Sequence, residues 1–296
     1  MKRTATLGSL RVGGDSPVRV MAAINVSPES FYKGSVVTLP KEIARRVKEA
    51  VRLGADIIDI GAMSTAPYLK NEVPVEVEKD RVRSALRAVE GIHAVVSVDT
   101  MDASVADMAL KNGARVVNDV SGLKNDVEMA SVVKRRGASL IAMAHSAGVS
   151  SGRPIEQVSR ALRATLRIAE DAGIPRNRVA LDPGIGFFRE RGAGRAYSPQ
   201  GSMSWAEWDV TVLAGLRSFD SLGSPLCVGL SRKSFIGKVL RLESPEQRLT
   251  GSIAATAVAV INGADIIRTH DVLETVQCVR MVEAIMGRVR RSGRGA

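Results

Sequence analysis

Asn262-Gly263-Ala264-Asp265-Ile266-Ile267-Arg268-Thr269-His270 contains the pattern that decides the fold: a glycine, a short β-branched run, and a polar residue where the run stops. A glycine readily adopts the left-handed conformation that ends a helix, and the apolar run after it is typical of a buried strand. The same pattern recurs at 53–60, 112–118 and 136–145. The chain is therefore built from strand–helix units.

Eight apolar runs end in polar residues in this way, and they predict strands at 18–25, 56–61, 94–99, 115–118, 139–145, 179–182, 226–233 and 265–270. Helical patterns lie between them at 40–53, 77–90, 102–112, 126–136, 156–172, 207–221, 246–262 and 272–287. Eight alternating units with no linker predict an α/β fold, a closed (β/α)₈ TIM barrel forming a single domain over 1–296. A doubly wound open sheet, the alternative, gives no reason for eight units and needs a G-x-G-x-x-G opening that this sequence lacks.

Four segments fall outside this regular alternation. Residues 1–17 contain a small hairpin or loop at 7–14, which we expect to plug the bottom of the barrel. Residues 64–75 and 188–204 follow the second and sixth strands, so we interpret them as mobile active-site loops at the rim. Residues 288–296 are expected to form a basic, flexible tail.

Composition limits the classes of function. The chain has 296 residues, 45% of them apolar, and a formal charge of +11. The charge fits either a solvated basic surface or attraction of anions, whether nucleic acid or phosphorylated small molecules. We expect no nucleic-acid partner, because no basic stripe alternates with aromatic residues. Cys227 and Cys278 lack metal-ligand spacing, and the sequence has no leader and no membrane-length apolar run, so a cytoplasmic protein is expected.

In a barrel of this class the chemistry lies at the carboxyl ends of the strands. The candidate residues there are Asn25, Thr65, Asp99, Asn118, His145, Asp182, Lys233, Arg268 and His270.

Arg268 and His270 are two residues apart and share one face of their strand. With Asn25 and Thr65 they form a corner suited to a phosphate or pyrophosphate, in which the amide oxygen of Asn25 is available to Mg²⁺. The alternative is that Arg268 pairs with a structural carboxylate, Asp265 or Asp271.

Asp99, Asn118 and Asp182 project toward the barrel mouth together with Lys233. Buried carboxylates need partners, so this group either pairs internally with Lys233 or binds a planar heterocycle with several N–H donors. A metal site is a third option, but His145 and His270 lie on distant strands without metal-ligand spacing. A Schiff base at Lys233 is disfavoured, because neighbouring aspartates raise the pKa of a lysine.

These residues lie in segments that resemble the dihydropteroate synthase family of pterin-binding TIM barrels. A divergent, archaeal-type member of that family is one form that the protein could take. The match covers about 18–285, and the joint occurrence of its segments in the family's order is specific. The matching segments are INVSPESF at 24–31, DIIDIG at 56–61, STAP at 64–67, SVDT at 97–100, VNDVSG at 117–122, LDPGIGF at 181–187, GLSRKS at 229–234 and RTHD at 268–271.

The resemblance implies a transferase that joins a pterin methyl diphosphate to an aminobenzoate and releases pyrophosphate. It implies Mg²⁺, held at Asn25, and a homodimer. The implied catalytic residues are Asp99, Asp182 and Lys233. The implied roles in substrate binding are Asp99, Asn118, Asp182 and Lys233 for the pterin, Asn25, Thr65, Arg268 and His270 for the diphosphate, and Phe187, Ser231, Lys233 and Ser234 for the arylamine.

The sequence also departs from the family pattern. Ala66 replaces the usual arginine of the second loop, Glu29 replaces an aspartate, and Asp209 stands where an asparagine contacts the pterin. These changes leave room for a methanopterin-type synthase that uses a ribosylated arylamine. A pterin-dependent methyltransferase acting with a corrinoid protein is the other alternative, although it has no use for Lys233 or the Arg268 corner.

Overall fold

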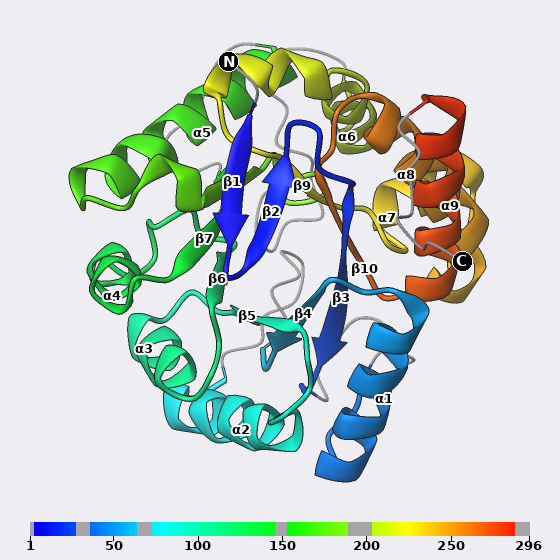
Figure 1. Ribbon diagram of the computed structural model, residues 1–296. Coiled ribbons are helices and arrows are strands. Elements are labelled where there is room, and N and C mark those ends of the chain that lie inside the picture. The colour runs from blue at the N-terminus through cyan, green and yellow to red at the C-terminus, as the bar shows by residue number, and fades with distance from the viewer. Residues whose placement is uncertain (1–2, 28–35, 64–72, 146–152, 189–202, 288–296) are drawn as a thin grey trace, which may run out of the picture.

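The computed structural model describes residues 3–27, 36–63, 73–145, 153–188 and 203–287. Eight parallel strands form a barrel in the order β8-β7-β6-β5-β4-β3-β10-β9, and a bridge between Leu181 and Leu226 joins its two ends (Figure 1). The (β/α)₈ prediction is therefore confirmed. The strands are β3 (Arg19–Asn25), β4 (Ile57–Gly61), β5 (Val95–Asp99), β6 (Val116–Asp119), β7 (Ser139–Met143), β8 (Val179–Asp182), β9 (Cys227–Gly229) and β10 (Ile266–Thr269).

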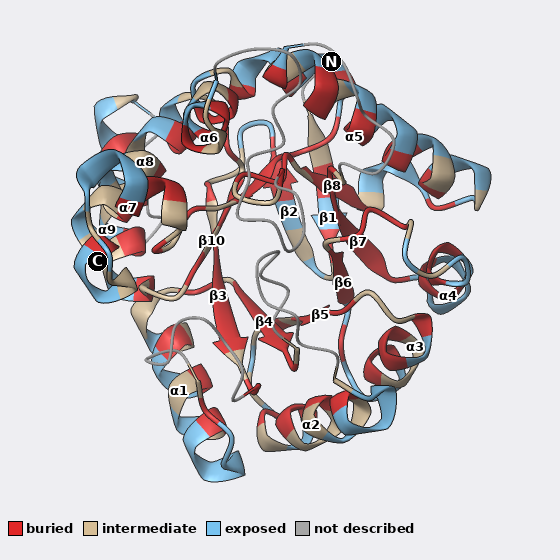
Figure 2. Ribbon diagram, turned by 180° about the vertical axis from the view of Figure 1, so that it is seen from behind, coloured by how far each residue is buried: buried red, intermediate tan, exposed pale blue. Residues whose placement is uncertain are grey.

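The helices surround the barrel and turn their buried faces toward the strands (Figure 2). In the first helix Ile43, Val47 and Ala50 are buried, at the spacing of one helical face, and Gly54 ends the helix with a φ of 105°. The helices are α1 (Pro40–Leu53), α2 (Val75–Ala88), α3 (Ala103–Lys111), α4 (Met129–Arg136), α5 (Pro154–Asp171), α6 (Trp205–Ala214), α7 (Ser234–Leu240), α8 (Leu249–Ile261) and α9 (Val272–Ile285). No helix among the described residues is long and apolar enough to cross a membrane.

The sequence-based boundaries fail at three places. The helix predicted at 207–221 ends at Ala214 and continues as the 3₁₀ helix η3 (Leu216–Leu222), and the break falls at Gly215, where a Cβ would meet the Ile155 side chain at 2.4 Å. The strand predicted at 226–233 stops at Gly229, and α7, which we did not predict, begins at Ser234. The helix predicted at 246–262 is divided into the 3₁₀ helix η4 (Pro245–Arg248) and α8.

The lower half of the barrel interior is apolar. Each of the eight strands contributes one buried side chain to this layer, namely Met21, Ile57, Val95, Val116, Ile141, Ala180, Cys227 and Ile266. The antiparallel hairpin β1 (Thr4–Leu7) and β2 (Leu10–Gly13) packs against the layer with the fully buried Leu7 and Val12 (Figure 1). The Gly8 amide donates to the Ser139 hydroxyl at 3.1 Å, which fixes the hairpin to β7. The hairpin therefore closes the amino-terminal end of the barrel.

Candidate active site at the carboxyl ends of the strands

The upper half of the barrel interior is polar, because every second residue of a strand faces inward. Two residues above the apolar layer, the inward positions are occupied by Asp59 on β4, Asn118 on β6, Asp182 on β8 and Arg268 on β10. The strands thus carry charged and amide side chains into a space that is enclosed by their own backbones. This is the candidate active site.

Arg268 lies between two buried carboxylates. Its Nε donates to Asp59 Oδ2 at 2.7 Å, and its Nη2 donates to Asp99 Oδ2 at 2.8 Å. Although burial alone favours its neutral form, these two carboxylates raise the pKa of Arg268 above its ordinary value. The guanidinium therefore remains a cation inside the barrel, in contact with the acidic residues and not in a separate corner opposite them.

The partners that the sequence offered for Arg268 are used elsewhere. Asp265 accepts a hydrogen bond from the Leu226 amide at 2.9 Å and lies 3.4 Å from Arg3. Asp271 pairs with Arg232 at 2.8 Å. Arg268 does pair with carboxylates, as the alternative held, but Asp265 and Asp271 are the wrong partners, because β10 turns Arg268 into the barrel toward Asp59 and Asp99.

Asp99 has an unusual protonation equilibrium. Burial raises the pKa of the Asp99 carboxyl to about 7; the positive charge of Arg268 opposes the shift, and the carboxylates of Asp59 and Glu78 add to it. Glu78 on α2 is itself buried, which raises its pKa, and it accepts a hydrogen bond from the Thr100 hydroxyl at 2.7 Å. Asp99 can thus change its protonation near neutral pH, in a position that faces Arg268.

Asn118 is connected to the same group, since its Nδ2 donates to Asp59 Oδ2 at 3.1 Å. Asp59 is fully buried and accepts from both Arg268 and Asn118. Asp59 is not among the site residues predicted from the sequence. One signal in the sequence could have identified it. Asp59 is the one carboxylate within the apolar run Ile57-Ile58-Asp59-Ile60, and it stands two residues after Ile57, so both side chains face the barrel interior.

Asp182 and Lys233 form the other side of the mouth. Burial raises the pKa of Asp182, while the charge of Lys233 opposes that shift. Asp182 Oδ1 accepts from the Gly184 amide at 2.7 Å, and Lys233 Nζ donates to the Ile185 carbonyl. The ammonium also lies 4.7 Å from the centre of the Phe187 ring. Three residues predicted from the sequence are therefore close together: Asp182 and Lys233, expected to bind the pterin, and Phe187, expected to contact the arylamine.

The turn from Ser231 to Ser234 connects β9 to α7. The Ser231 hydroxyl donates to Asp271 Oδ2 at 3.1 Å, Lys233 is the N-cap residue of α7, and Ser234 is its first residue. This turn carries Lys233 to the barrel mouth. The Ser231 side chain is directed to Asp271, which follows β10.

His270 provides a neutral imidazole to this end of the barrel. Burial and the nearby charge of Arg268 lower the pKa of His270 to about 4. At neutral pH the last strand therefore brings one positive charge, that of Arg268, while His270 acts as a hydrogen-bonding group. The phosphate-binding corner predicted from the sequence therefore carries one positive charge, that of Arg268, and not a second one from His270.

Asn25 lies at the end of β3, which pairs with β10 and thereby places Asn25 beside the Arg268 strand. A Cβ on Gly61 would stand 3.7 Å from both Asn25 Oδ1 and Asp99 Oδ2, so the glycine leaves room between these two oxygens. The described residues contain no cluster of three His, Cys, Asp or Glu side chains that could hold a metal ion. Thr65 lies outside the described residues, and His145 follows β7, three strands from β10 around the barrel.

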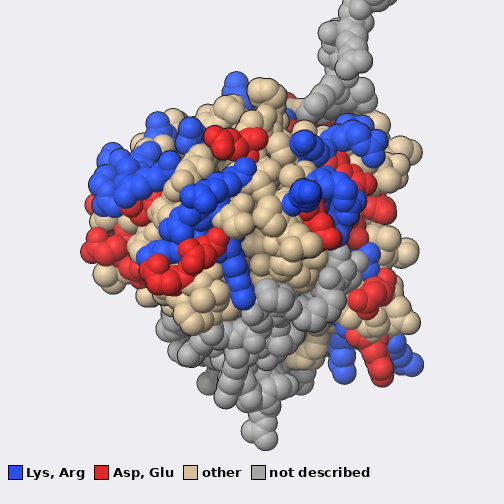
Figure 3. Space-filling view, turned by 90° about the horizontal axis from the view of Figure 1, so that it is seen from below, with Lys and Arg blue, Asp and Glu red and all other residues tan. Residues whose placement is uncertain are grey.

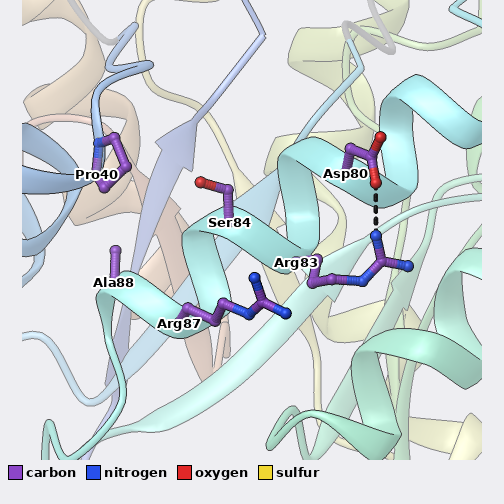
Figure 4. Close-up of a pocket in the computed structure, with 6 residues that line it drawn as sticks. All are labelled: Pro40, Asp80, Arg83, Ser84, Arg87 and Ala88. Carbon is purple, nitrogen blue, oxygen red and sulfur yellow. Dashed lines mark hydrogen bonds and ion pairs between the residues drawn. The ribbon is translucent and has the colours of Figure 1, made fainter.

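A hollow lies between the start of α1 and the α2 helix (Figure 4). It has a volume of about 380 Å³ and is lined by Pro40 from α1 and by residues of α2. The charge of Arg83 there is met by Asp80 at 2.5 Å. Figure 3 likewise shows basic and acidic side chains interspersed on one face of the molecule. The concentrated chemistry is thus in the barrel, not on this surface.

Known proteins are similar to this chain in sequence and in fold. Residues 21–270 match the family described as pterin binding enzymes. A dihydropteroate synthase from Clostridium beijerinckii is 34% identical over 271 residues, which cover 91% of this chain and 94% of that protein.

Two solved dihydropteroate synthases have the same architecture. One from Clostridium difficile, determined in the presence of pteroic acid, has a TM-score of 0.80 and 34% identity, over 92% of this chain and 97% of that chain. One from Xanthomonas albilineans, with 4-aminobenzoic acid, has a TM-score of 0.81 and 31% identity, over 97% of this chain and 99% of that chain.

Proposed function

The chain belongs to the family of pterin-binding enzymes, and we propose that it is a dihydropteroate synthase-type transferase of folate biosynthesis. It condenses a 6-hydroxymethyl-dihydropterin diphosphate with an aminobenzoate and releases pyrophosphate. The observation that carries the assignment is the enclosed group of Asp59, Asp99, Asn118 and Arg268 at the carboxyl ends of the strands, because a planar heterocycle with several N–H donors requires such acceptors.

The pterin binds to Asp99, Asn118, Asp182 and Lys233 in this proposal. Carboxylate and amide oxygens accept hydrogen bonds from the N–H groups on one edge of the ring, and a carboxylate meeting such an edge forms charge-assisted bonds. Asp182 is held in place by the Gly184 amide. Lys233 supplies a donor for the carbonyl or a ring nitrogen on the other side of the heterocycle.

The diphosphate binds toward Asn25, Thr65, Arg268 and His270. Asn25 offers a side-chain oxygen beside Gly61, which has no side chain to cover it, so the residue suits a hard cation that takes most of its ligands from the substrate and water. When bound there, Mg²⁺ would neutralise charge on the departing diphosphate. Arg268 adds a fixed positive charge near the same end of the barrel.

The reaction needs no protein nucleophile. The arylamine nitrogen attacks the methylene carbon, the bond from that carbon to the diphosphate oxygen breaks, and its electron pair leaves with pyrophosphate; the nitrogen then loses a proton. Asp99 and Asp182 favour positive charge developing on the pterin methylene. Phe187, Ser231, Lys233 and Ser234 frame the arylamine beside that carbon.

We also propose a cytoplasmic homodimer. Helices α8 and α9 pack together and expose apolar side chains that are between 43% and 74% accessible, a surface that a second copy would cover: Val258, Ile261, Leu273, Met281 and Ile285. The two cysteines are unpaired, which fits a reducing compartment.

Calorimetry with 6-hydroxymethyl-dihydropterin diphosphate, with and without Mg²⁺, tests the assignment together with pyrophosphate release. We expect binding that strengthens with Mg²⁺, and release on adding 4-aminobenzoate or, for a methanopterin-type enzyme, a ribosylated arylamine. Asp182→Asn should weaken pterin binding about 100-fold, since it removes a charged acceptor. Absence of release with every arylamine, or methyl transfer to a corrinoid acceptor, would exclude the assignment.

A further inference from the structure

We propose that Asp59 is a positioning residue of the pterin pocket, which fixes the orientations of the Asn118 amide and the Arg268 guanidinium so that the pocket presents acceptor oxygens to the ligand. This inference rests on the proposed function. It adds a buried residue of β4 that contacts both of the proposed ligand-binding side chains.

One oxygen atom makes both contacts. Asp59 Oδ2 accepts from Arg268 Nε at 2.7 Å and from Asn118 Nδ2 at 3.1 Å. Asp59 is the third residue of β4 and is fully buried, so the contacts are made deep in the barrel, away from solvent. In such surroundings a charge-assisted hydrogen bond is strong and an unpaired polar group is costly.

The first consequence concerns the direction of the Asn118 amide. A side-chain amide has a donating and an accepting end, and without a fixed partner either end could face a ligand. Asp59 Oδ2 accepts from Arg268 Nε, so the end of the Asn118 amide that faces this oxygen is its donating nitrogen. The carbonyl oxygen of Asn118 is then turned away from Asp59, and it becomes an acceptor for a ligand N–H group.

The second consequence concerns Arg268. Asp59 binds its Nε and Asp99 binds its Nη2, so carboxylates on two strands hold the guanidinium at two points and fix its plane. A planar guanidinium held in this way loses little further freedom when a ligand binds.

Two remaining oxygens indicate that the arrangement is built for a ligand. Asp59 Oδ1 and Asp99 Oδ1 are buried and have no hydrogen-bond partner within the part of the chain that the structure describes. Buried carboxylate oxygens in proteins normally have partners. Together with Asn118 Oδ1 they add acceptor oxygens to the polar half of the barrel, which favours a heterocycle that donates from several nitrogens.

An exchange of the two side chains tests this role. Asp59→Asn and Asn118→Asp, as single variants, each leave a mismatched pair, and we expect each to lose at least about 30-fold in affinity for 6-hydroxymethylpterin by calorimetry. In the double variant one atom can no longer serve both neighbours, so the amide of residue 59 has to rotate until its oxygen accepts from Arg268 and its nitrogen donates to the aspartate at 118. We expect its affinity to return to within about fivefold of the parent, because charge count and hydrogen bonds are conserved.

Ser97→Ala is the matched control. Ser97 is buried and pairs in register with Asp59 across β4 and β5, but no hydrogen bond connects its hydroxyl to a described residue. This variant should bind the pterin like the parent. Steady-state kinetics should place the losses of the single variants in KM for the pterin diphosphate more than in kcat.

The outcomes separate the inference from the proposed function. If the parent binds no pterin, the proposed function fails. If the parent binds and releases pyrophosphate but Asp59→Asn binds equally well, only the positioning role fails. The positioning role also fails if the losses of binding free energy in the two single variants simply add up in the double variant. It fails as well if the double variant does not fold. Where a single variant does not fold, the affinity of the double variant alone decides.

Discussion

Two arginines that are largely shielded from solvent, Arg232 and Arg268, have carboxylate partners, yet their surroundings differ. Arg232, in the turn after β9, binds Asp271 through Nε and Nη2 and donates from Nη1 to the carbonyls of Pro245 and Glu246. Arg268, inside the barrel, holds Asp59 and Asp99, each of which keeps a buried oxygen without a partner among the described residues. The first cluster is complete and the second is incomplete.

The difference separates stability from function. A complete cluster connects segments of the chain, and here Arg232 joins the β9–α7 turn to η4 and to the end of β10. An incomplete cluster tolerates unsatisfied groups at an energetic cost, and such sites are where ligands bind. Changes at Arg232 should therefore act mainly on folding, and changes around Arg268 mainly on ligand affinity.

The largest effect is expected for Arg232→Met. The substitution leaves Asp271 buried without its cation and two carbonyls without a donor, which should lower the free energy of unfolding by about 3–5 kcal/mol. Urea denaturation followed by circular dichroism measures the loss. Arg83→Met is the control, because its pair with Asp80 is largely exposed, and it should cost less than about 1 kcal/mol. If Arg232→Met and Arg83→Met lowered the free energy of unfolding equally, the Arg232 cluster would have no special role in stability.

Asp99→Asn should show the opposite balance. The amide keeps an oxygen for Arg268 but presents a donor where the pterin needs an acceptor, so we expect about 100-fold weaker pterin binding. The free energy of unfolding should change by less than about 1 kcal/mol. The substitution weakens the attraction to Arg268, but it also removes the repulsion between Asp99 and the neighbouring carboxylates. Calorimetry and urea denaturation on the same preparation give both numbers. A large loss of stability with unchanged affinity would reverse the comparison.

The smallest expected effect is a pH dependence of pterin affinity. With a pKa of about 7, Asp99 is ionised in roughly a tenth of the free molecules at pH 6 and nine-tenths at pH 8. If the carboxylate is the binding form, affinity should rise about tenfold over this range. Titrations at several pH values measure the slope, and Asp99→Asn should flatten it. A slope that persists in the variant would assign the dependence to another group.

The pH dependence of folding stability reports less clearly on the protonation of Asp99, because Asp99 and His270 change the stability in opposite directions. The raised pKa of Asp99 means that the folded protein holds a proton that the unfolded chain has lost, so its contribution to stability falls as pH rises from about 4 to 7. The lowered pKa of His270 acts in the other direction, and its contribution falls as pH drops from about 6.5 to 4. Ligand affinity avoids this partial cancellation.

The sequence predicts the barrel well, because glycine-ended helices and β-branched runs are local signals. It also predicts which residues lie at the strand ends, since parallel strands in a barrel share one catalytic end. It could not show that Arg268 reaches Asp59 and Asp99, because a pairing across three strands depends on the barrel's closure. Nor could it separate α7 from the preceding strand, since the left-handed turn at Arg232, with a φ of 55°, occurs at a residue that gives no such signal.

The hairpin formed by β1 and β2 has a kinetic consequence. Leu7 and Val12 close the amino-terminal end of the barrel, so the substrates of the proposed reaction would reach Asp59 and Asn118 from the carboxyl ends of the strands. Asp59 and Asn118, which belong to the proposed pterin pocket, are buried, whereas Phe187 and Lys233 are partly exposed. An arylamine that arrived first would stand in the way of the pterin, so turnover should follow a compulsory sequence in which the pterin diphosphate enters before its co-substrate.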